Sequence, residues 1–492
     1  MVDKRKDEDR RRSSVSNSLN RMLVTMIVTV FMVVACAGTP TPTRGPAATG
    51  AAPTGTPTTS AAPPATAPGA TATAPAAGVT LTHWYYDFPP FANYQQERAT
   101  EFEAANPGVT IDFDSSIPPV GEGGFEDKIT SSLATGTAPD VFSVFSPQAP
   151  RIIDKDQLAP IDDAAVQALG YASVDEMKAE RVDGAFDAWT DADGTIYGIP
   201  DAISFLTLYC NNDHLTAGGV DPATLEMNTW DDFIAMGEQV VEANPDFYKD
   251  ASGAWTHNFI KLPMYQDDGW SMQVLQTFLS QTGGSVLSAD GSAFALNEAA
   301  GVAAVDKMME VSRTLGDPNI GPVVPGELHG AVASGDMTCG LAGEWFYGAF
   351  LKPTDSPLLD HYTAFPLPRV TADQPGNVFW GWSFVVNAAT EDKETAWKYI
   401  GHLTSDPNGI IADVGIWPPV KDVTELQAVT DTPFGDVIAD NREGAQHLFK
   451  SLSYSDIARV LRGKVELMAF EGADVQSTLD GTADEVNQIL AQ

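Results

Sequence analysis

Three apolar runs at the start of the globular part decide the fold: Val79-Thr-Leu-Thr-His-Trp-Tyr-Tyr86, Val109-Thr-Ile-Asp-Phe-Asp114 and Asp140-Val-Phe-Ser-Val-Phe145. Each run is rich in β-branched and aromatic residues, which favours a strand. Between them, residues 91–105 and 125–135 place apolar side chains at helical spacing, and Gly136 suits the end of the second helix. Strand starts about 30 residues apart predict βαβ units and a parallel, doubly wound α/β sheet.

The same runs predict where a ligand binds, because ligands of such sheets lie beyond the carboxyl ends of the strands. Those ends are residues 84–88, 114–117 and 145–148. At the first end, Trp84 and Tyr85 are candidate contacts, although alternation sends neighbouring side chains to opposite faces and at least one of them to the core. Asp87 at the rim is a candidate acceptor for a hydroxyl group. Asp140 starts its strand at the far end, so we expect a structural cap there.

The segment before the globular part has the composition of an export signal followed by a tether. Seven Lys and Arg residues precede an apolar run, 22–35, that is too short to span a bilayer comfortably. The run ends in Val33-Val34-Ala35-Cys36, which resembles the bacterial lipobox and implies lipidation of Cys36. Residues 37–78 are almost entirely Ala, Thr, Pro and Gly, which predicts a disordered tether. The alternative is an ordinary cleaved signal with an incidental cysteine. Both place the protein outside the cytoplasm, and lipidation places it on the outer face of the cytoplasmic membrane.

Length and charge narrow the class of protein. Residues 79–492 exceed a single ordinary core, which predicts two lobes. The segment before Cys36 holds seven of the 28 basic and four of the 66 acidic residues, so the remainder carries 62 acids against 21 bases. This field excludes nucleic acid and anionic lipid as partners. Cys210 and Cys339 either pair or stay as two buried thiols. Asp191-Ala-Asp-Gly194 lacks the later ligands of a calcium loop and predicts a turn, so we expect no metal site and no cofactor.

Six segments of the globular part have the character of one known family: Glu101-Phe-Glu-Ala-Ala-Asn-Pro-Gly-Val109, Leu133-Ala-Thr-Gly-Thr-Ala-Pro-Asp-Val141, Asp193-Gly-Thr-Ile-Tyr-Gly-Ile-Pro200, Thr229-Trp-Asp-Asp-Phe233, Gly335-Asp-Met-Thr-Cys-Gly-Leu-Ala-Gly-Glu-Trp345 and Lys393-Glu-Thr-Ala-Trp-Lys-Tyr-Ile400. In this order they resemble the extracellular solute-binding proteins of bacterial ABC sugar importers, the maltose-binding-like group of family 1. The resemblance covers essentially all of the globular part.

The resemblance implies a two-lobed, periplasmic-binding-protein-like fold of type II, with a doubly wound sheet in each lobe and a hinge between them. The N-terminal lobe would comprise residues 79–200 and about 384–430. The C-terminal lobe would comprise about 201–383 and 431–492. It further implies a monomeric, non-enzymatic receptor that binds a sugar or oligosaccharide between the lobes and delivers it to the permease subunits of an ABC transporter.

The resemblance also adds candidate contacts for the ligand. Trp345 matches a position where the family commonly places a stacking aromatic residue, and Glu344 precedes it. Trp382 flanks the return crossing together with Trp380; one of the two would pack the hinge and the other line the cleft. Asp201 follows the first crossing, one residue earlier than the acid of many relatives. At the third strand end, where some relatives carry an acid, the candidate here is Ser146 in Ser146-Pro147-Gln148.

Three alternatives stay open from the sequence. The same fold can bind a polyol, a phosphorylated glycerol or another small metabolite, because the segments that carry the resemblance are mostly scaffold. It can also bind a metal, and His83 with Tyr85 or Tyr86 would imitate the ligand set of ferric-binding relatives. A secreted glycoside hydrolase also combines acids and aromatic residues in a cleft.

Overall fold

The computed structural model describes residues 78–118, 124–352, 357–371, 376–442 and 444–492. The signal, Cys36 and the tether up to residue 77 lie outside the described residues, so their predicted roles stay predictions. Among the helices that the structure describes, none is long and apolar enough to cross a membrane.

The first lobe is built on a five-stranded sheet in the order β2-β1-β3-β10-β4. Strands β1 (Val79–Tyr86), β2 (Val109–Ile117) and β3 (Val141–Phe145) are parallel, as the sequence predicts. Strand β10 (Trp382–Val386) returns late in the chain and pairs antiparallel with β3 and with β4 (Ile199–Pro200). The sheet is therefore mixed, because the chain re-enters it from the second lobe.

The predicted helices between these strands are confirmed. Helix α2 (Pro89–Ala105) follows β1, and α3 (Phe125–Thr135) follows β2 and ends at Gly136, whose φ of 69° is left-handed. Asp140 has the predicted structural role, because its Oδ2 accepts hydrogen bonds from the backbone N–H (2.9 Å) and hydroxyl (2.8 Å) of Thr82 and so joins β3 to β1.

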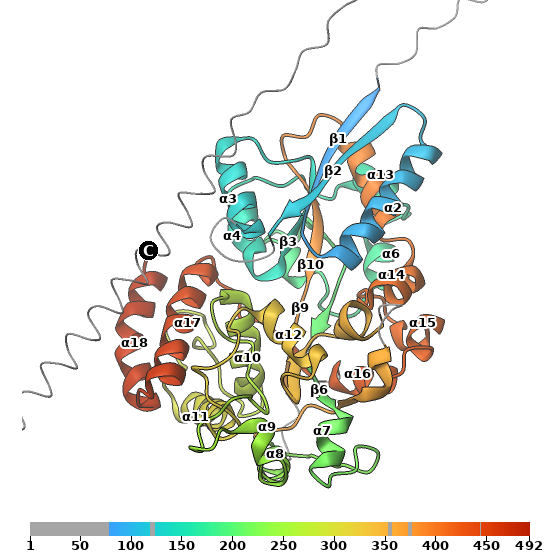
Figure 1. Cartoon of the computed structure of the whole chain (residues 1–492). Coiled ribbons are helices and arrows are strands. Elements are labelled where there is room, and N and C mark those ends of the chain that lie inside the picture. The colour runs from blue at the N-terminus through green and yellow to red at the C-terminus, as the bar shows by residue number, and fades with distance from the viewer. Residues whose placement is uncertain (1–77, 119–123, 353–356, 372–375, 443) are drawn as a thin grey trace, which may run out of the picture. The chain divides into compact units, whose positions relative to one another are not determined.

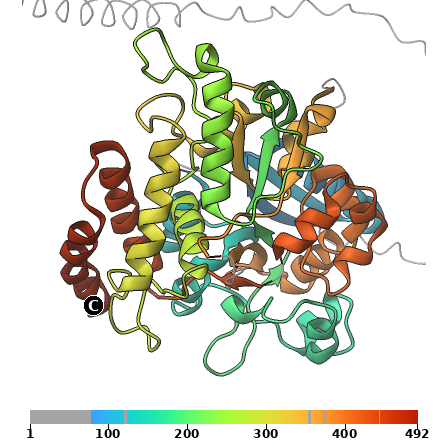
Figure 2. The ribbon, with the colours of Figure 1, turned by 90° about the horizontal axis from the view of Figure 1, so that it is seen from below.

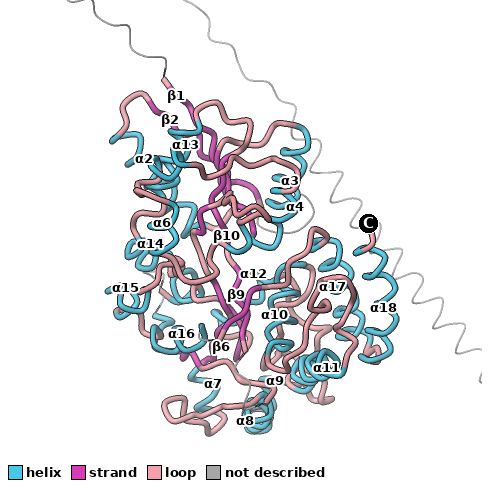
Figure 3. Tube along the Cα trace, turned by 180° about the vertical axis from the view of Figure 1, so that it is seen from behind, coloured by secondary structure: helices cyan, strands magenta, loops and turns pink. Residues whose placement is uncertain are grey.

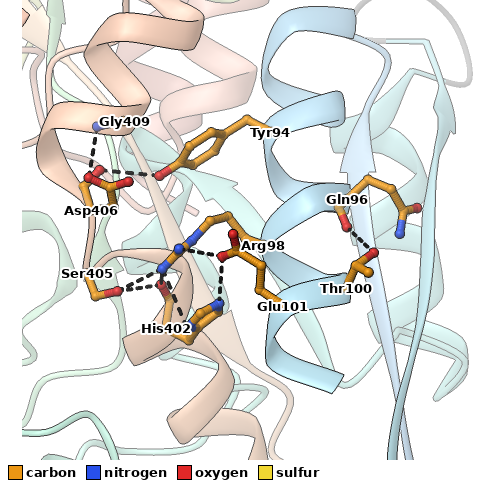
Figure 4. Close-up of polar contacts among 9 residues, drawn as sticks. All are labelled: Tyr94, Gln96, Arg98, Thr100, Glu101, His402, Ser405, Asp406 and Gly409. Carbon is orange, nitrogen blue, oxygen red and sulfur yellow. Dashed lines mark hydrogen bonds and ion pairs between the residues drawn. The ribbon is translucent and has the colours of Figure 1, made fainter. Parts of the chain in front are cut away.

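The returning chain packs its helices α13 (Lys393–Leu403) and α14 (Pro407–Val414) onto α2 (Figure 4). Arg98 of α2 forms the centre of this contact: it pairs with Glu101 at 2.7 Å and donates to the Ser405 hydroxyl at 2.8 Å. It also donates to the backbone carbonyl of His402. This last bond gives a side-chain donor to a carbonyl group at the end of α13, where helix carbonyls lack a partner four residues further on. Helices α13 and α14, although they come late in the chain, thereby become part of the first lobe.

The second lobe has a small three-stranded sheet instead of a large doubly wound one. Strands β7 (Cys339–Ala342), β6 (Thr207–Asn211) and β8 (Tyr362–Phe365) form an antiparallel sheet in that order. Cys210 and Cys339 are register partners in it and form a disulfide, which settles the alternative left open by the sequence. The fold class is thus confirmed, but the doubly wound arrangement expected in each lobe is replaced here by antiparallel pairs.

Helices enclose the second lobe. The C-terminal pair α17 (Tyr454–Glu471) and α18 (Val475–Leu490) packs against α10 (Asp268–Ser280) and α11 (Ala299–Thr314) (Figure 1). Seen from below, this pair and the segment 407–442 lie on opposite sides of the strands (Figure 2). The remaining helices of four or more residues in an α conformation are α4 (Ala149–Ile153), α5 (Asp163–Ala168), α6 (Val174–Ala179), α7 (Asn212–Ala217), α8 (Trp230–Ala243), α9 (Pro245–Tyr248), α12 (Pro325–Ser334), α15 (Gln427–Thr430) and α16 (Gly435–Arg442).

A third small sheet, β11-β9-β5, lies where the chain passes between the lobes. It joins β5 (Ser204–Phe205), β9 (Asn377–Trp380) and β11 (Ala445–His447). Each lobe has its own apolar core, and the two cores meet at these crossing strands. Phe205 belongs to the core of the first lobe, and Leu206 and Trp380 belong to the core of the second. The strands form one column with helices on either side (Figure 3). We call β11-β9-β5 the hinge sheet. The lobe boundaries at 200/201, 383/384 and 430/431 stay a prediction.

Glycine is required at one point of the hinge. Gly381 lies between β9 and β10, and a Cβ there would collide with the backbone carbonyl oxygen of Ala202 on the first crossing. Its own carbonyl accepts a hydrogen bond from the backbone N–H of Ser146 at 2.9 Å. The two crossings can therefore approach this closely only because residue 381 has no side chain.

Candidate ligand-binding site

A cavity of about 290 Å³ lies between the lobes and is lined by both. The first lobe contributes the carboxyl ends of β1 and β3 and the start of α3, as the strand-end rule predicts. The second lobe contributes the N-terminal ends of α10 and α12 and the segment after β7. The lining residues are Tyr85, Tyr86, Asp87, Phe88, Glu126, Phe145, Ala202, Ser204, Asp267, Gly269, Trp270, Gln273, Pro325, Gly326, His329, Trp345, Phe350, Trp380, Trp382 and Ile416.

Aromatic side chains form the walls of the cavity. On the first lobe, Tyr86 packs against Trp382 with ring centroids 4.9 Å apart. On the second lobe, the Trp270 and Trp345 rings meet edge to face at 6.1 Å. Phe88 meets Trp345 edge to face at 5.9 Å, so the two walls touch across the interlobe gap. Flat apolar faces of this kind suit a ligand with apolar CH surfaces.

The position of Trp345 follows from its local sequence. The residue comes two positions after Gly343, and a Cβ on that glycine would collide with the indole nitrogen of Trp345. The indole is therefore folded back over the glycine. Its other neighbours are the rings of His329, at 5.0 Å, and Phe350, at 6.2 Å. Packing on several sides holds the ring at the cavity edge.

Two acidic side chains face the cavity from opposite lobes. Glu126 lies in the first turn of α3, where the Gln148 side-chain amide donates to it. Asp267 caps α10 by accepting from the Trp270 backbone N–H at 2.6 Å. Burial and the charges of Asp267 and Asp268 raise the pKa of Glu126 to about 8. Burial, with a smaller contribution from Asp268, raises the pKa of Asp267 to about 6.

Two further polar lining groups, His329 and Gln273, are neutral. His329 is buried on α12, its Nε2 lies 3.2 Å from the Leu341 carbonyl oxygen, and burial lowers the pKa of its ring to about 4. Gln273 on α10 is 4% exposed, and its side-chain carbonyl oxygen has no hydrogen-bond partner among the described residues. Such an acceptor is costly to bury unless a ligand or water satisfies it.

Four of the eight residues predicted as ligand contacts are brought together in this cavity. They are Tyr85, Asp87, Trp345 and Trp382. Asp87 is exposed at the rim and Tyr85 is buried beneath Tyr86, with the two rings stacked at 4.3 Å. Trp380 lines the cavity as well, so both tryptophans that flank Gly381 face it.

The other four predicted contacts do not line the cavity. Trp84 lies under the Lys128 ammonium group, 5.1 Å from the ring centroid. Ser146 contacts the hinge at Gly381 through its backbone N–H. Strict alternation would put Trp84 on the same face as Tyr86, but the register of β1 against β2 shifts between these two residues, and Trp84 lies further from the strand end.

The two remaining residues, Asp201 and Glu344, are buried acids behind the cavity wall. Glu344 is 1% exposed; its Oε1 accepts from the Ser204 hydroxyl at 2.9 Å and from the Trp417 backbone N–H at 3.5 Å. Burial raises the pKa of Glu344 to about 8 and that of Asp201 to about 7. Neither Asp201 carboxylate oxygen has a hydrogen-bond partner within the described part of the chain. Glu344 thus ties the hinge crossing at Ser204 to the loop at Trp417.

Several lining residues were not singled out from the sequence: Tyr86 and Phe88 as contacts, Glu126, Asp267, Trp270, Gln273, His329 and Phe350. One signal could have found two of them. Asp267 and Trp270 stand at the start of a helical pattern, where an N-cap residue presents the helix end to a ligand.

Across all the residues that the structure describes, no group of three or more His, Cys, Asp or Glu side chains is placed to hold a metal ion. Asp191 forms the predicted turn, its Oδ1 accepting from the N–H groups of Asp193 and Thr195, each at 2.9 Å.

A cavity enclosed by two α/β lobes, with a small sheet of crossing strands between them, defines a two-lobed binding protein of the periplasmic type. Residues 87–410 match the family of bacterial extracellular solute-binding proteins, and the chain belongs to that family.

Individual relatives agree with this assignment. The chain is 25% identical to the lactose-binding protein of Rhizobium radiobacter over 334 residues, which cover 66% of this chain and 70% of the relative. In fold it is similar to a solute-binding protein from Thermotoga lettingae solved with α-D-tagatose, with a TM-score of 0.71 at 18% identity over 84% of this chain and 100% of that one. The maltose-bound MalE3 of T. maritima gives a TM-score of 0.71 at 15% identity, over 84% of this chain and 100% of the other.

Proposed function

We propose that this protein binds a sugar or oligosaccharide in the interlobe cavity and delivers it to the permease of an ABC transporter. The observation that carries the proposal is the lining: aromatic faces from both lobes, with carboxylate and amide acceptors among them. Sugars present apolar CH faces and rows of hydroxyl donors, so they need both kinds of surface. We propose Trp345, Trp382, Tyr85 and Asp87 as contacts, together with Trp270, Glu126 and Gln273.

Capture would work by closing the lobes on the ligand. A ligand that touches Trp382 on one lobe and Trp270 on the other gains contacts in the closed form that the open form lacks. That differential affinity shifts the equilibrium toward closure. The closed form is what the permease would recognise. No bond is made or broken in this cycle, so the protein acts as a receptor and not as an enzyme.

The predicted anchor fits this role. Lipidation at Cys36 would hold the protein on the outer face of the cytoplasmic membrane, and residues 37–78 would serve as a tether. A tethered receptor stays at a high local concentration near its permease, which raises the frequency of productive encounters.

The lining also bears on the alternative ligands. A phosphorylated glycerol would bring negative charge into a cavity that contains Asp87, Glu126 and Asp267, where like charges repel. His83, the residue invoked for a metal, is buried in the first core, and its Nδ1 lies 3.0 Å from the Tyr399 hydroxyl. Neutral saccharides and polyols carry no negative charge for these acids to repel, and they need no metal-binding histidine.

A thermal-shift screen of mono- and oligosaccharides, polyols and glycerol phosphates tests the proposal. A ligand present at 100 times its dissociation constant adds about 2.7 kcal/mol to the free energy of unfolding. We expect a saccharide to raise the unfolding temperature of the protein, and to raise that of the Trp345→Ala variant by clearly less. Stabilisation by glycerol phosphate alone, or turnover of chromogenic glycosides above the blank, would contradict the proposal.

A further inference from the structure

We propose that the cavity selects a saccharide that carries a protonated amine. This inference rests on the proposed function, because it names the chemical class of ligand that the same cavity takes. It starts from the charges of the lining residues, which are all of one sign.

The charged residues that line the cavity are Asp87, Glu126 and Asp267, and the lining contains neither Lys nor Arg. His329 does not offset them, because burial keeps its ring neutral by lowering its pKa to about 4. A buried charge is stable only when a partner of opposite sign or several hydrogen bonds compensate it. Within the described lining no cation is available for that purpose, so Glu126 keeps its proton instead, and a cationic ligand would allow it to ionise.

Three of the groups close to Glu126 are themselves acids. Asp267 and Asp268 lie at the start of α10, and Asp127 follows on its own helix. Tyr454 of α17 faces Glu126, Asp267 and Asp268, and its buried hydroxyl has no hydrogen-bond partner within the described chain. The neutral Gln148 amide is the hydrogen-bond donor to Glu126. Burial is the main reason that the pKa of Glu126 is raised to about 8, and these like charges raise it further.

The cation that acts on Asp267, Arg462, is already engaged in ion pairs. Arg462 of α17 lies 2.6 Å from Asp268 and 2.9 Å from Glu466. It lowers the pKa of Asp267 only as a minor effect, against burial and the charge of Asp268. Arg462 therefore compensates mainly Asp268 and only weakly Asp267, which leaves the pKa values of Asp267 and Glu126 raised.

A metal ion does not suit this need. No group of three or more His, Cys, Asp or Glu side chains in the described chain is placed to hold a metal. The acids face each other across a cavity of about 290 Å³, which has room for an organic cation. The lining tryptophans favour the same choice, since indole faces attract ammonium groups.

An independent observation concerns the hydrogen-bond pattern. The side-chain carbonyl oxygen of Gln273 is buried at the cavity and has no partner among the described residues. An ammonium group offers three donors and no acceptor. Gln273 and two carboxyl groups, once Glu126 is ionised, therefore offer acceptors for the three donors of an ammonium group, whereas a hydroxyl donates only one hydrogen bond.

Binding of such a ligand has a consequence that a neutral sugar lacks. At pH 7 a carboxyl group with a pKa of about 8 is mostly protonated. A ligand ammonium next to it favours the ionised form, so Glu126 releases its proton on binding. A neutral sugar leaves the proton in place. Proton release therefore reports the charge of the ligand separately from the affinity.

The test compares matched pairs of sugars by isothermal titration calorimetry. The probes are glucosamine with glucose, galactosamine with galactose, mannosamine with mannose, and their β-1,4-linked disaccharides, in which an ammonium replaces a hydroxyl of similar size. Titration in two buffers of different ionisation enthalpy gives the number of protons released. We expect at least one amino sugar to bind about tenfold tighter than its neutral partner, with release of about one proton per ligand at pH 7.

Two variants assign the preference to the acids. Glu126→Gln keeps the shape of the side chain, and Asp267→Asn keeps a residue that can cap α10. Each should reduce the preference for the amino sugar to about threefold or less, and Glu126→Gln should abolish proton release. Glu97→Gln is the control, because it makes the same change of charge at an exposed residue of α2 outside the lining.

The outcomes separate this inference from the proposed function. Neutral sugars that bind as tightly as their amino partners in every pair would overturn the inference and leave the proposed function standing. A preference for amino sugars that survives in both cavity variants would also overturn it. Failure of every amino and neutral saccharide to bind would overturn both.

Discussion

Replacing Glu344 by Gln should change the pH dependence of stability and leave ligand binding almost unchanged. The family resemblance makes Glu344 a candidate contact, whereas its carboxyl group is buried behind the cavity wall and bonds to Ser204 and Trp417. Gln keeps the accepting oxygen toward Ser204 and imitates the protonated acid. The variant therefore separates a residue that touches the ligand from one that holds the hinge.

The size of the effect follows from the pKa of Glu344, which burial raises from 4.5 to about 8. Between these two pH values the unfolded chain has lost the proton and the folded protein has kept it. Unfolding then releases a proton, so the contribution of Glu344 to stability falls as pH rises from about 4.5 to about 8. The full difference is about 5 kcal/mol. Below about pH 4.5 both states are protonated and the variant should match the wild type.

The assay is chemical denaturation at pH values from 4 to 9, combined with titration of a sugar identified by the screen. We expect the variant to gain stability over the wild type as pH rises, up to about 5 kcal/mol near pH 8, with an affinity within about twofold. Asp87→Asn is the matched control, because Asp87 lines the cavity and is exposed; it should weaken binding without this change in stability. If Glu344→Gln abolished binding while its stability followed the wild type at every pH, the assignment of Glu344 to the hinge would be wrong.

The remaining predictions concern the wall, the disulfide and the hinge. Trp345→Ala should weaken sugar binding at least about tenfold and remove most of the ligand-induced change in tryptophan fluorescence. Trp84→Ala, outside the lining, should leave the affinity unchanged. An equal loss of affinity in both variants would refute the placement of Trp345 in the cavity wall and Trp84 outside it. Replacing Cys210 and Cys339 by Ala should lower the free energy of unfolding by about 2–5 kcal/mol, toward the upper end because 129 residues separate them. A denaturation midpoint unchanged by the double substitution would count against the disulfide. Gly381→Ala should destabilise the protein by about 1–3 kcal/mol, since its Cβ collides with the first crossing, and unaltered thermal unfolding would show that the crossings can separate.

The first lobe could be predicted from sequence because its early elements are local and regularly spaced. Strands and helices alternate within residues 79–145, and each helix end carries its own signal, such as the left-handed Gly136 after α3. The second lobe offers no such period. Its strands are short, and pairs such as β6 and β7 join residues separated by more than 100 positions, which tertiary packing alone brings together.

The same distinction explains which site residues were found. Asp87 follows from the strand-end rule, and Trp345 follows from the family resemblance. Trp270 and His329 come from helices of the second lobe, and no local pattern places them beside the strand ends of the first. Glu344 is a residue that was predicted as a contact and lies outside the cavity. Its neighbour Trp345 lines the cavity, but consecutive residues face different ways, so the Glu344 side chain points into the hinge.

Four acids near the cavity have raised pKa values, and the causes divide them into two functional kinds. Burial alone raises the pKa values of Asp201 and Glu344, which lie outside the lining, so no ligand can relieve their cost. For Glu126, repulsion from Asp267 and Asp268 on the other lobe adds to burial, and for Asp267 repulsion from its neighbour Asp268 does; a cation beside these acids would relieve that part. If the lobes close as we propose, the empty protein would resist closing more strongly as pH rises, whereas a protein holding an ammonium would not. An amino sugar would therefore supply both the contacts and the charge that closure requires.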